Sequence, residues 1–494
     1  MPSSQRRKSE SSSSTQTGKE VFFYLIVVFI ALVFCLEIAL FNDAGTNTVE
    51  IRMLDIASNF MAPRNVDNGR EVTSRLVEPT NDDGNYQIDL PPHLLPHPPI
   101  LPLFNSIPNA EDHIKSVLDG RPTMLGVIAL MQKFISELHD SNMKDRESDG
   151  QTLLNNFFRI TEKHVKPFHD AYKGRTIFPV REDDSIYISL AAFREFFLVE
   201  TLESAFKNAK HPEKLFVGAV VQNCFGAIRD DGTIDTSGTP CKSGKQKVGV
   251  DKNGNDIRKS FDIGVDKNGI EAFCALPDYK KYCDNGQVRV LYQHHFDGQG
   301  PSMARFYASK LWGGETFFLQ IDSHLRFAHE WDAKFIADAK LTLNYPKSVM
   351  SSYPPGFDQI RFIPKKMRVA LKGKIDNNTV VESPGCRLCH CGTPPGINPM
   401  IHIAQSKSYR GNETRPTQIP FIGAGLVFAH GSFLKDVPFD PYLPYTFMGE
   451  EILLAMRLWT NGWNIHAPRK NLVIHQYRPG KLGLPKFYMS IAGM

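Results

Sequence analysis

The pattern of hydrophobic and polar residues changes several times along this chain. Residues 1–20 are polar and rich in serine, and residues 21–41 form one apolar run that only Glu37 interrupts. Residues 42–183 mix short apolar segments with a stretch rich in proline. From residue 184 to residue 494, short apolar runs alternate with segments of helical spacing, which is typical of an α/β domain. The pattern therefore predicts a tail, an anchor, a stem and one folded body.

The apolar run at 21–41 predicts an uncleaved, single-pass membrane anchor of type II orientation. At about 1.5 Å per residue, a helix of this length crosses the ~30 Å hydrocarbon layer. Basic residues precede the run and none follows it directly, which favours a cytosolic tail at 1–20. A cleaved signal peptide is one alternative, although its apolar core is usually only about 7–15 residues long. A buried core helix is the other. The anchor places the body in the lumen of the Golgi or of another secretory-pathway membrane.

Residues 42–183 are expected to form the stem between the anchor and the body. The stretch at 90–104 is rich in proline, which favours an extended spacer. Two segments, 123–140 and 151–172, have apolar residues at helical spacing. We expect them to pack together as a small helical stem.

The body has the order of strands and helices of an open α/β sheet. Apolar runs predict strands at 186–190, 215–222 and 288–292, and helical spacing predicts a helix at 195–207. A polar insertion at about 230–281 contains two copies of Gly-Val-Asp-Lys-Asn-Gly. Each Asn-Gly pair is a strong signal for a tight hairpin turn, so we expect β-hairpins here. Calcium loops are the weaker alternative, because the required acidic spacing and terminal glutamate are missing.

Composition and charge exclude several classes of protein. Apolar residues make up 41% of the chain and charged residues 22%, so a large core can form and general disorder is excluded. The 57 basic and 53 acidic residues leave a net charge of only +4. This balance does not predict a nucleic-acid-binding protein.

Eight cysteines are too few for a disulfide-dense small domain but enough for several bridges. Cys35 lies in the apolar run, and the other seven would face an oxidising lumen. Short loops would be closed by Cys274 with Cys283, or by Cys224 with Cys241, although sequence does not determine the connectivity. The cluster at 386–391 has three cysteines and a histidine but lacks the second ligand pair of a structural zinc site. Disulfides, zinc and free thiols remain open for that cluster.

A helix is expected between the proline near residue 300 and the glycine pair at 313–314. The N-terminus of a helix is a natural site for a phosphate, because its backbone amides have no intrahelical partner. Arg305 would lie in the second turn and add a charged contact. An ordinary amphipathic helix with a surface arginine is the alternative.

Asp322 and His324 are the clearest candidates for chemistry. They end the apolar run at 315–322, which predicts a central strand, and residues i and i+2 of an extended chain point to the same side. His475 ends another apolar run. In open α/β sheets, ligands bind beyond the carboxyl ends of the strands. One carboxylate and two imidazoles suit Mn²⁺ or a similar divalent ion. Helix capping by Asp322 and His324, and a structural role for His475, are the alternatives.

Two further groups of residues lie between these candidate ligands. Gly423 and Gly425 lack side-chain bulk, so another backbone or a ligand can approach them closely. Glu450 and Glu451 begin a predicted helix, where the helix dipole favours negative charge. Such acids either cap the helix or contact a sugar hydroxyl or the incoming nucleophile. Neighbouring helix positions diverge by about 100°, so we expect only one of them to face a given pocket.

These motifs together resemble the eukaryotic polypeptide α-N-acetylglucosaminyltransferase family, which modifies hydroxyproline or Ser/Thr with UDP-GlcNAc. The resemblance covers roughly residues 185–487 and includes Gly-Pro-x-x-Ala-Arg305, Leu-Gln-Ile-Asp-Ser-His324, Phe-Met-Gly-Glu-Glu451 and Ile-His475-x-Tyr. It implies a GT-A fold, which is a Rossmann-like nucleotide-sugar-binding domain, and a reaction that retains the anomeric configuration. It also implies a divalent metal, Mn²⁺ or Mg²⁺, and UDP-GlcNAc as the donor.

The resemblance also implies roles for individual residues. Asp322 and His324 match the family's Asp-x-His form of the DxD metal-binding motif, and His475 matches its late histidine. Glu450 and Glu451 match acids that contact the acceptor or the sugar and are the catalytic candidates. The candidates for substrate binding are Arg305, Ser189, Arg194, Gly423, Gly425 and Trp331.

The expected protein is a membrane-anchored transferase that moves N-acetylglucosamine to a hydroxyl group of an acceptor protein or peptide. One alternative keeps the fold and uses another UDP-sugar, such as UDP-GalNAc or UDP-Gal. The other is a catalytically inactive, membrane-tethered sugar-binding protein. The sequence leaves the oligomeric state open.

Overall fold

A computed structural model describes most of the chain beyond residue 106. The described residues are 107–145, 148–172, 178–358, 380–392, 402–408, 413–447, 449–477 and 487. The predicted anchor at 21–41 and the proline-rich stretch at 90–104 lie outside these residues. Within the described part, no helix combines the length and the apolar character that crossing a membrane requires.

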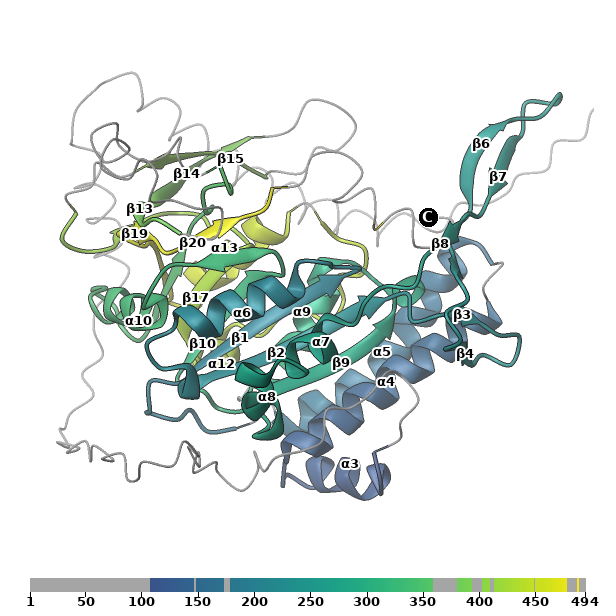
Figure 1. Cartoon of the computed structure of the whole chain (residues 1–494), viewed down its shortest axis with the longest axis horizontal. Coiled ribbons are helices and arrows are strands. Elements are labelled where there is room, and N and C mark those ends of the chain that lie inside the picture. The colour runs from purple at the N-terminus through teal and green to yellow at the C-terminus, as the bar shows by residue number, and fades with distance from the viewer. Residues whose placement is uncertain are drawn as a thin grey trace, which may run out of the picture. The chain divides into compact units, whose positions relative to one another are not determined.

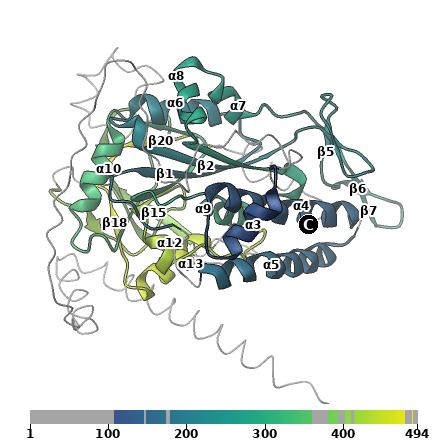
Figure 2. The ribbon, with the colours of Figure 1, turned by 90° about the horizontal axis from the view of Figure 1, so that it is seen from below.

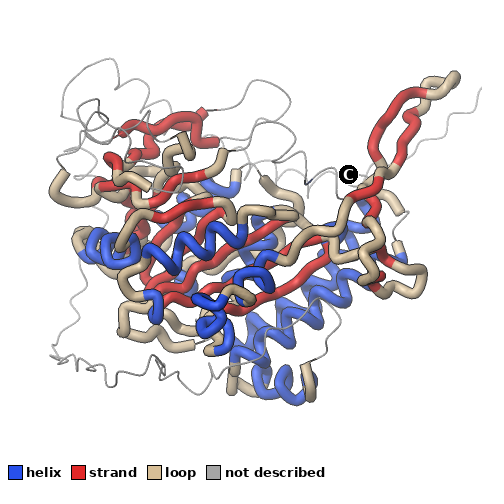
Figure 3. Tube along the Cα trace, in the orientation of Figure 1, coloured by secondary structure: helices blue, strands red, loops and turns tan. Residues whose placement is uncertain are grey.

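An eight-stranded mixed sheet forms the centre of the fold (Figures 1 and 3). Its strand order is β16 (Thr417–Gln418), β18 (Asn464–Ala467), β12 (Ser348–Ser351), β17 (Leu426–His430), β10 (Phe317–Asp322), β1 (Ile186–Phe193), β2 (Leu215–Asn223), β9 (Val288–His294). The four strands from β10 to β9 run parallel, and β17 lies antiparallel to β10. The strands predicted from the apolar runs are thus confirmed. Every residue of β2 and β9 is buried, as expected for strands covered on both faces.

Helices cover both faces of this sheet (Figure 2). One face packs with a cluster that includes residues of α6 (Leu198–Asn208), α7 (Gly269–Cys274), α8 (Pro277–Asp284) and α10 (Trp331–Lys340). The other face packs with α9 (Pro301–Ser309), α12 (Phe433–Asp436), α13 (Glu450–Thr460), α3 (Ala110–Leu118), α4 (Met124–Lys144) and α5 (Gly150–Tyr172). Successive residues of β1 belong to opposite clusters, because strand side chains alternate between the faces.

The two helices predicted in the stem are confirmed as α4 and α5. They do not form a separate small bundle, however. Val127, Met131 and Phe134 of α4 are fully buried in the same hydrophobic cluster as the sheet and α9. The apolar stripe of α4 therefore packs onto the body, so residues before 184 contribute to the core of the domain.

The polar insertion confirms one hairpin signal and corrects the other. β6 (Gln246–Val250) and β7 (Asp256–Lys259) form an exposed hairpin around Gly254, whose φ of 84° suits glycine (Figure 1). The second Asn-Gly pair does not make a hairpin turn. Asn268 has a φ of −75° and caps α7, with its side chain accepting hydrogen bonds from the amides of Ile270 and Glu271. The helix that follows thus determines the role of this asparagine.

Both disulfides considered from the sequence are present, Cys224–Cys241 and Cys274–Cys283. The first joins the end of β2 to the base of the insertion, next to the short pairs β3 (Ala227–Ile228) with β4 (Ile234–Asp235) and β5 (Cys241–Lys242) with β8 (Asp262–Ile263). The side chain of Cys391 lies outside the described residues, so the cluster at 386–391 stays undecided.

Three small two-stranded sheets and two 3₁₀ helices complete the described structure. The sheets pair β11 (Leu325–Phe327) with β20 (Val473–His475), β13 (Ser383–Pro384) with β19 (Lys470–Asn471), and β14 (Cys386–Gly392) with β15 (His402–Ser408). The 3₁₀ helices are η2 (Pro212–Lys214) and η3 (His295–Asp297). The first of the small sheets matters for the site, because it brings the late part of the chain to the end of β10.

Candidate active site at the carboxyl edge of the sheet

Three side chains from distant parts of the chain meet where β10 ends. Asp322 is the last residue of β10, and His324 follows it in the turn to β11. β20 pairs with β11 so that His475 lies opposite Leu325, the residue after His324. One potential ligand atom of each of Asp322, His324 and His475 lies within 4.8 Å of the others. The convergence expected from the ends of the two apolar runs is therefore present.

The carboxylate of Asp322 is the centre of this cluster. Its Oδ2 lies 3.0 Å from Nε2 of His475, and its Oδ1 accepts a 3.3 Å hydrogen bond from Nη2 of Arg305. Burial alone would raise the pKa of Asp322. The hydrogen bond with His475 and the charges of His475 and Arg305 outweigh that effect and hold the pKa well below its usual range. Asp322 is therefore an anion at neutral pH.

The donor atoms and the space around them fit a divalent cation. One carboxylate and two imidazoles within reach of one another are ligands that Mn²⁺ and similar ions accept. His475 Nδ1 is buried and has no hydrogen-bond partner among the described residues. A Cβ atom at Gly425 would lie 2.9 Å from Oδ2 of Asp322, so only glycine leaves room beside this oxygen. A side chain at residue 425 would therefore press on the carboxylate.

Arg305 joins this cluster to the next acid along the chain. Its side chain is only 11% exposed, so the alternative of a surface arginine on an amphipathic helix is wrong. Nη1 donates to Oε2 of Glu450 while Nη2 donates to Asp322. Burial would lower the pKa of Arg305, but the negative charges of Glu450 and Asp322 outweigh burial. The pKa of Arg305 is therefore raised above its ordinary value. Arg305 therefore links α9, β10 and α13 through two charge-assisted hydrogen bonds.

Glu450 and Glu451 point to different partners, as expected for neighbouring helix positions. Oε2 of Glu451 accepts a 2.6 Å hydrogen bond from the Tyr353 hydroxyl, and its Oε1 accepts a 2.8 Å bond from the amide of Ala424. Burial raises the pKa of Glu451 more than these bonds lower it. Burial and the negative charge of Glu451 in turn raise the pKa of Tyr353.

The space beside each of the two glycines, which we expected to admit a ligand or a backbone, is filled by a side chain of this chain. A Cβ atom at Gly423 would lie 2.7 Å from the ring of Tyr353, and Gly425 is in contact with Asp322. The pair therefore makes room for an aromatic ring and a carboxylate. The predicted close approach is present, but the approaching groups belong to the chain itself.

Three of the expected substrate-binding residues are buried or paired within the chain. Trp331 is fully buried, and its Nε1 donates to the backbone oxygen of Ala205, so the ring packs in the core. Ser189 is 1% exposed inside β1, level with Gln320 and two residues behind the position of Asp322. A ligand cannot reach a side chain that has no exposed surface.

Arg194 is the third of these residues. Its guanidinium donates 2.8 Å and 3.2 Å hydrogen bonds to the two carboxylate oxygens of Asp266 in the insertion. Its φ of 48° lies in the left-handed region, at the end of β1. Arg194 therefore ties the insertion to the carboxyl edge of the sheet.

Sequence reasoning missed Glu195 and Tyr353 as residues of the site. Glu195 lies two residues after the end of β1, and its Oε2 is 3.0 Å from Nδ1 of His324. Because β1 is the direct neighbour of β10, the position of Glu195 at the same edge was available as a signal. Tyr353 lies two residues after the end of β12, and no motif marks it.

Aromatic residues contact or follow two residues of the site, His475 and Glu195. The ring of Tyr477 lies 4.2 Å from that of His475, and the Phe197 ring lies 6.0 Å from that of Phe357. Tyr477 and Phe196 are 51% and 56% exposed, respectively. These flat surfaces are available to a ring-shaped ligand such as a base or a sugar.

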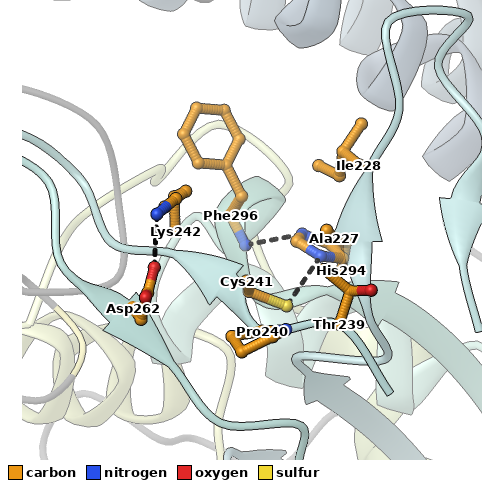
Figure 4. A pocket seen from close by; sticks show the side chains of 9 residues that line it. All are labelled: Ala227, Ile228, Thr239, Pro240, Cys241, Lys242, Asp262, His294 and Phe296. Atoms are coloured by element: carbon orange, nitrogen blue, oxygen red, sulfur yellow. Dashed lines mark hydrogen bonds and ion pairs between the residues drawn. The ribbon is translucent and has the colours of Figure 1, made fainter. Parts of the chain in front are cut away.

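A separate cavity of about 330 Å³ lies at the base of the insertion (Figure 4). Its lining includes Cys241, Lys242, Asp262, His294 and Phe296, and none of the three candidate metal ligands. Lys242 and Asp262 form an ion pair at its mouth, and Nδ1 of His294 accepts from the amide of Phe296. Because Cys241 is in a disulfide, this cavity does not offer the cysteine as a metal ligand.

The comparisons with known proteins point to one family. The family model described as "Glycosyltransferase (GlcNAc)" matches residues 185–492. No curated protein matches the chain. The solved structure of GalNAc-T7 with UDP, GalNAc and Mn²⁺ is similar, with 15% identity and a TM-score of 0.36 over 60% of this chain and 44% of that chain. The structure of S. aureus TarS 1–349 in complex with UDP-GlcNAc has 14% identity and a TM-score of 0.30 over 60% of this chain and 59% of that chain. The match thus spans less than two thirds of either of those chains.

Proposed function

This chain belongs to the Glycosyltransferase (GlcNAc) family, and on that premise we propose that it moves N-acetylglucosamine from UDP-GlcNAc to a hydroxyl group of a protein. The proposed acceptor is a serine, threonine or hydroxyproline side chain, as in the polypeptide α-N-acetylglucosaminyltransferases that the motifs resemble. The observation that carries the proposal is the meeting of Asp322, His324 and His475 at the carboxyl edge of a parallel sheet. Ligands of open α/β folds bind at this edge.

Asp322, His324 and His475 are the residues that would hold a divalent cation, Mn²⁺ or Mg²⁺. When bound, such a cation neutralises the charge that develops on the departing diphosphate. Arg305 supplies a fixed positive charge beside these residues, since it donates to Asp322 at 3.3 Å. A preorganised cation in a largely buried site stabilises a developing negative charge better than one that must move into place.

Glu450 and Glu451 are the proposed contacts for the sugar or the acceptor hydroxyl. Tyr353 and the amide of Ala424 hold Glu451, and Arg305 holds Glu450, so each carboxylate has a fixed direction. We propose that the reaction retains the anomeric configuration by an internal return, with the acceptor attacking on the face that UDP leaves. This route needs no carboxylate as a covalent nucleophile.

The proposed address is the lumen of the Golgi or of another secretory-pathway membrane, with residues 21–41 as a type II anchor. Two disulfides in the described domain support an oxidising compartment, because such bonds are rare in the cytosol. Protease protection of the full chain in sealed vesicles tests the orientation. Digestion of the domain without detergent would contradict it.

A donor and acceptor screen of the purified full-length chain in detergent tests the reaction. UDP-GlcNAc, UDP-GalNAc and UDP-Gal are each offered with Mn²⁺ or with a chelator, together with peptides that contain serine, threonine or hydroxyproline. We expect transfer from UDP-GlcNAc that the chelator abolishes. Transfer from another UDP-sugar alone would replace the donor assignment.

The screen also separates an enzyme from a sugar-binding protein. If no donor is consumed but the chain binds a sugar equally well with and without chelator, the catalytic proposal is wrong. Anomeric NMR of the product distinguishes retention from inversion.

A further inference from the structure

A buried carboxylate lies directly behind one of the three candidate ligands. Glu195 is in the turn between β1 and α6, and its side chain is only 3% exposed. Its Oε2 lies 3.0 Å from Nδ1 of His324. The contact joins two segments that are 129 residues apart in the sequence. Glu195 is therefore positioned to act on the ring of His324 from the side of the protein interior.

The carboxylate itself is held in place. Its Oε1 accepts a 2.7 Å hydrogen bond from the backbone amide of Phe197. Each oxygen of Glu195 thus has a partner, one on the backbone of its own turn and one on the imidazole. A carboxylate fixed at both oxygens can hold a ring at a defined angle.

The first turns of α6 also fix the backbone around His324. The hydroxyl of Thr201 donates a 3.0 Å hydrogen bond to the oxygen of Ser323 and accepts a 3.0 Å bond from the amide of Leu325. These two bonds hold the residues on either side of His324. The segment 195–201 therefore restrains both the backbone and the ring of this candidate ligand.

The contact also determines which ring nitrogen carries the proton. A carboxylate oxygen accepts hydrogen bonds, so Nδ1 of His324 must be the donor in this pair. In a neutral imidazole the other nitrogen, Nε2, then keeps its lone pair and can bind a metal. His475 has no matching arrangement, because its Nδ1 lacks a hydrogen-bond partner among the described residues. The support is thus specific to His324.

From these contacts we propose that Glu195 is a positioning residue for metal binding. Its carboxylate accepts a hydrogen bond from the Nδ1–H group of His324. This bond leaves the lone pair of Nε2 available to a metal and directs the ring toward the site shared with Asp322 and His475. This inference rests on the proposed metal site. Loss of such a supporting hydrogen bond typically lowers metal affinity by about 10- to 100-fold.

Titration of the full-length chain with Mn²⁺, followed by the electron paramagnetic resonance signal of the free ion, tests the proposal without a donor or acceptor. The variants are Glu195→Ala, Glu195→Gln and Glu195→Leu. Glu200→Ala is the matched control, because Glu200 is an exposed acid in the first turn of α6. Asp322→Ala reports the loss of a direct ligand, and thermal unfolding of each variant shows whether the fold is intact.

We expect Glu195→Ala and Glu195→Leu to bind Mn²⁺ about 10- to 100-fold more weakly than the wild type. Glu195→Gln should keep most of the wild-type affinity for Mn²⁺, because the amide oxygen of glutamine can still accept a hydrogen bond from Nδ1–H of His324. Glu200→Ala should bind as the wild type does. Equal losses in Glu195→Gln and Glu195→Ala would assign the effect to charge and overturn the positioning role.

The remaining outcomes separate this inference from the proposed function. If the wild type binds Mn²⁺, Asp322→Ala does not, and Glu195→Ala is unchanged, the inference is wrong while the metal site stands. If the wild type binds no Mn²⁺, both are wrong. Histidine ¹⁵N NMR of the wild type, with the His324 signal assigned by His324→Gln, gives a second test that needs no Glu195 variant. A proton on Nδ1 supports the inference, and a proton on Nε2 overturns it.

Discussion

Two clusters of histidine and aspartate in this domain differ in how completely their polar atoms are paired. In the interior cluster, Nδ1 of His139 on α4 lies 2.6 Å from Oδ2 of Asp297 in η3, and the side chains are 3% and 0% exposed. In the edge cluster, His475 lies 3.0 Å from Asp322, whose side chain is 30% exposed. The residue types are the same, and the surroundings differ.

The interior cluster has a partner for each of its polar atoms. Nε2 of His139 lies 3.2 Å from the oxygen of Gly232, and Oδ1 of Asp297 accepts a 2.8 Å hydrogen bond from Asn142. The edge cluster keeps an unpartnered buried nitrogen, Nδ1 of His475, among the described residues, and Gly425 places no side chain against Asp322. A fully paired histidine–carboxylate pair has no capacity left for a ligand, whereas the partly paired one has. Pairing, rather than residue type, therefore distinguishes the interior pair from the candidate site.

The interior cluster also connects two regions of the chain. His139 and Asn142 lie on α4, outside the residues 185–492 that the family model matches. Asp297 lies inside that range and shortly before α9, which carries Arg305. The helix that precedes the family region therefore helps to hold the segment that leads into the site.

The largest expected effect comes from removing the central carboxylate of the edge cluster. Asp322→Ala should lower the rate of sugar transfer by roughly 10²–10³-fold or more, because a charge-stabilising group is lost from the reaction site. The melting temperature should change little, since Asp322 is at the edge of the sheet. Steady-state kinetics and a thermal scan measure both. Asp278→Ala, at an exposed position of α8, is the control, and full activity in Asp322→Ala would exclude a catalytic role for the cluster.

Removing the carboxylate of the interior cluster, Asp297, should lower the free energy of unfolding. Asp297→Ala leaves the buried His139 and Asn142 without their shared partner, which typically costs about 3–5 kcal/mol of unfolding free energy. Urea unfolding of the full chain measures the loss. Asp284→Ala breaks an exposed ion pair with Lys280 and should cost no more than about 0.5 kcal/mol. Equal stability of Asp297→Ala and the wild type would remove the distinction between the two clusters.

The pH dependence of stability offers a third comparison. Burial would lower the pKa of His139, but the charge and hydrogen bond of Asp297 raise it to about 9. Because the folded pKa exceeds the unfolded value of about 6.5, the stabilisation is complete below pH ~6.5 and is lost as the pH rises through 9. The loss should reach at most about 3–4 kcal/mol, at ~1.4 kcal/mol for each pH unit of the shift.

A difference measurement isolates this group from others that titrate in the same range, such as the buried Lys310, whose pKa burial lowers to about 8. Urea unfolding of the wild type and of His139→Gln is compared between pH 6 and 10. The difference in unfolding free energy should shrink with rising pH. A constant difference would show that the pKa of His139 is the same in the folded and the unfolded chain.

The sequence predicted the edge cluster better than the interior one for a physical reason. Asp322 ends a strand of the central sheet, where ligands of open α/β folds bind, so Asp322 and His324 carried a signal in their own positions. His475 ends an apolar run that forms β20 of a separate two-stranded sheet, and the motif resemblance added to its signal. His139 and Asp297 are 158 residues apart, and no periodicity links a helix to a turn at that distance. The contact between Glu195 and His324 spans 129 residues and was missed as well, although β1, which precedes Glu195, is the direct neighbour of β10.

Individual residue roles depended on packing that sequence patterns do not contain. Trp331 belongs to a motif of the family, yet its ring lies in the core against Ala205. Asn268 carries a hairpin signal, yet the residues after it form α7 and it becomes a cap. The positions of the central strands followed from apolar runs, because burial on both faces of a sheet imposes those runs directly.

The smallest expected effect tests whether the edge cluster needs a residue without a side chain at Gly425, next to Asp322. A methyl group at residue 425 would lie 2.9 Å from Oδ2 of Asp322, a distance at which the carboxylate must move by a few tenths of an ångström. Gly425→Ala should therefore lower transfer about tenfold, since small displacements of a catalytic group are costly. The Mn²⁺ affinity should fall with it, while stability changes little. Gly249→Ala in β6 is the control, because a Cβ atom there meets nothing within 4 Å. If Gly425→Ala binds Mn²⁺ and transfers sugar like the wild type, the space beside Asp322 is not part of the site.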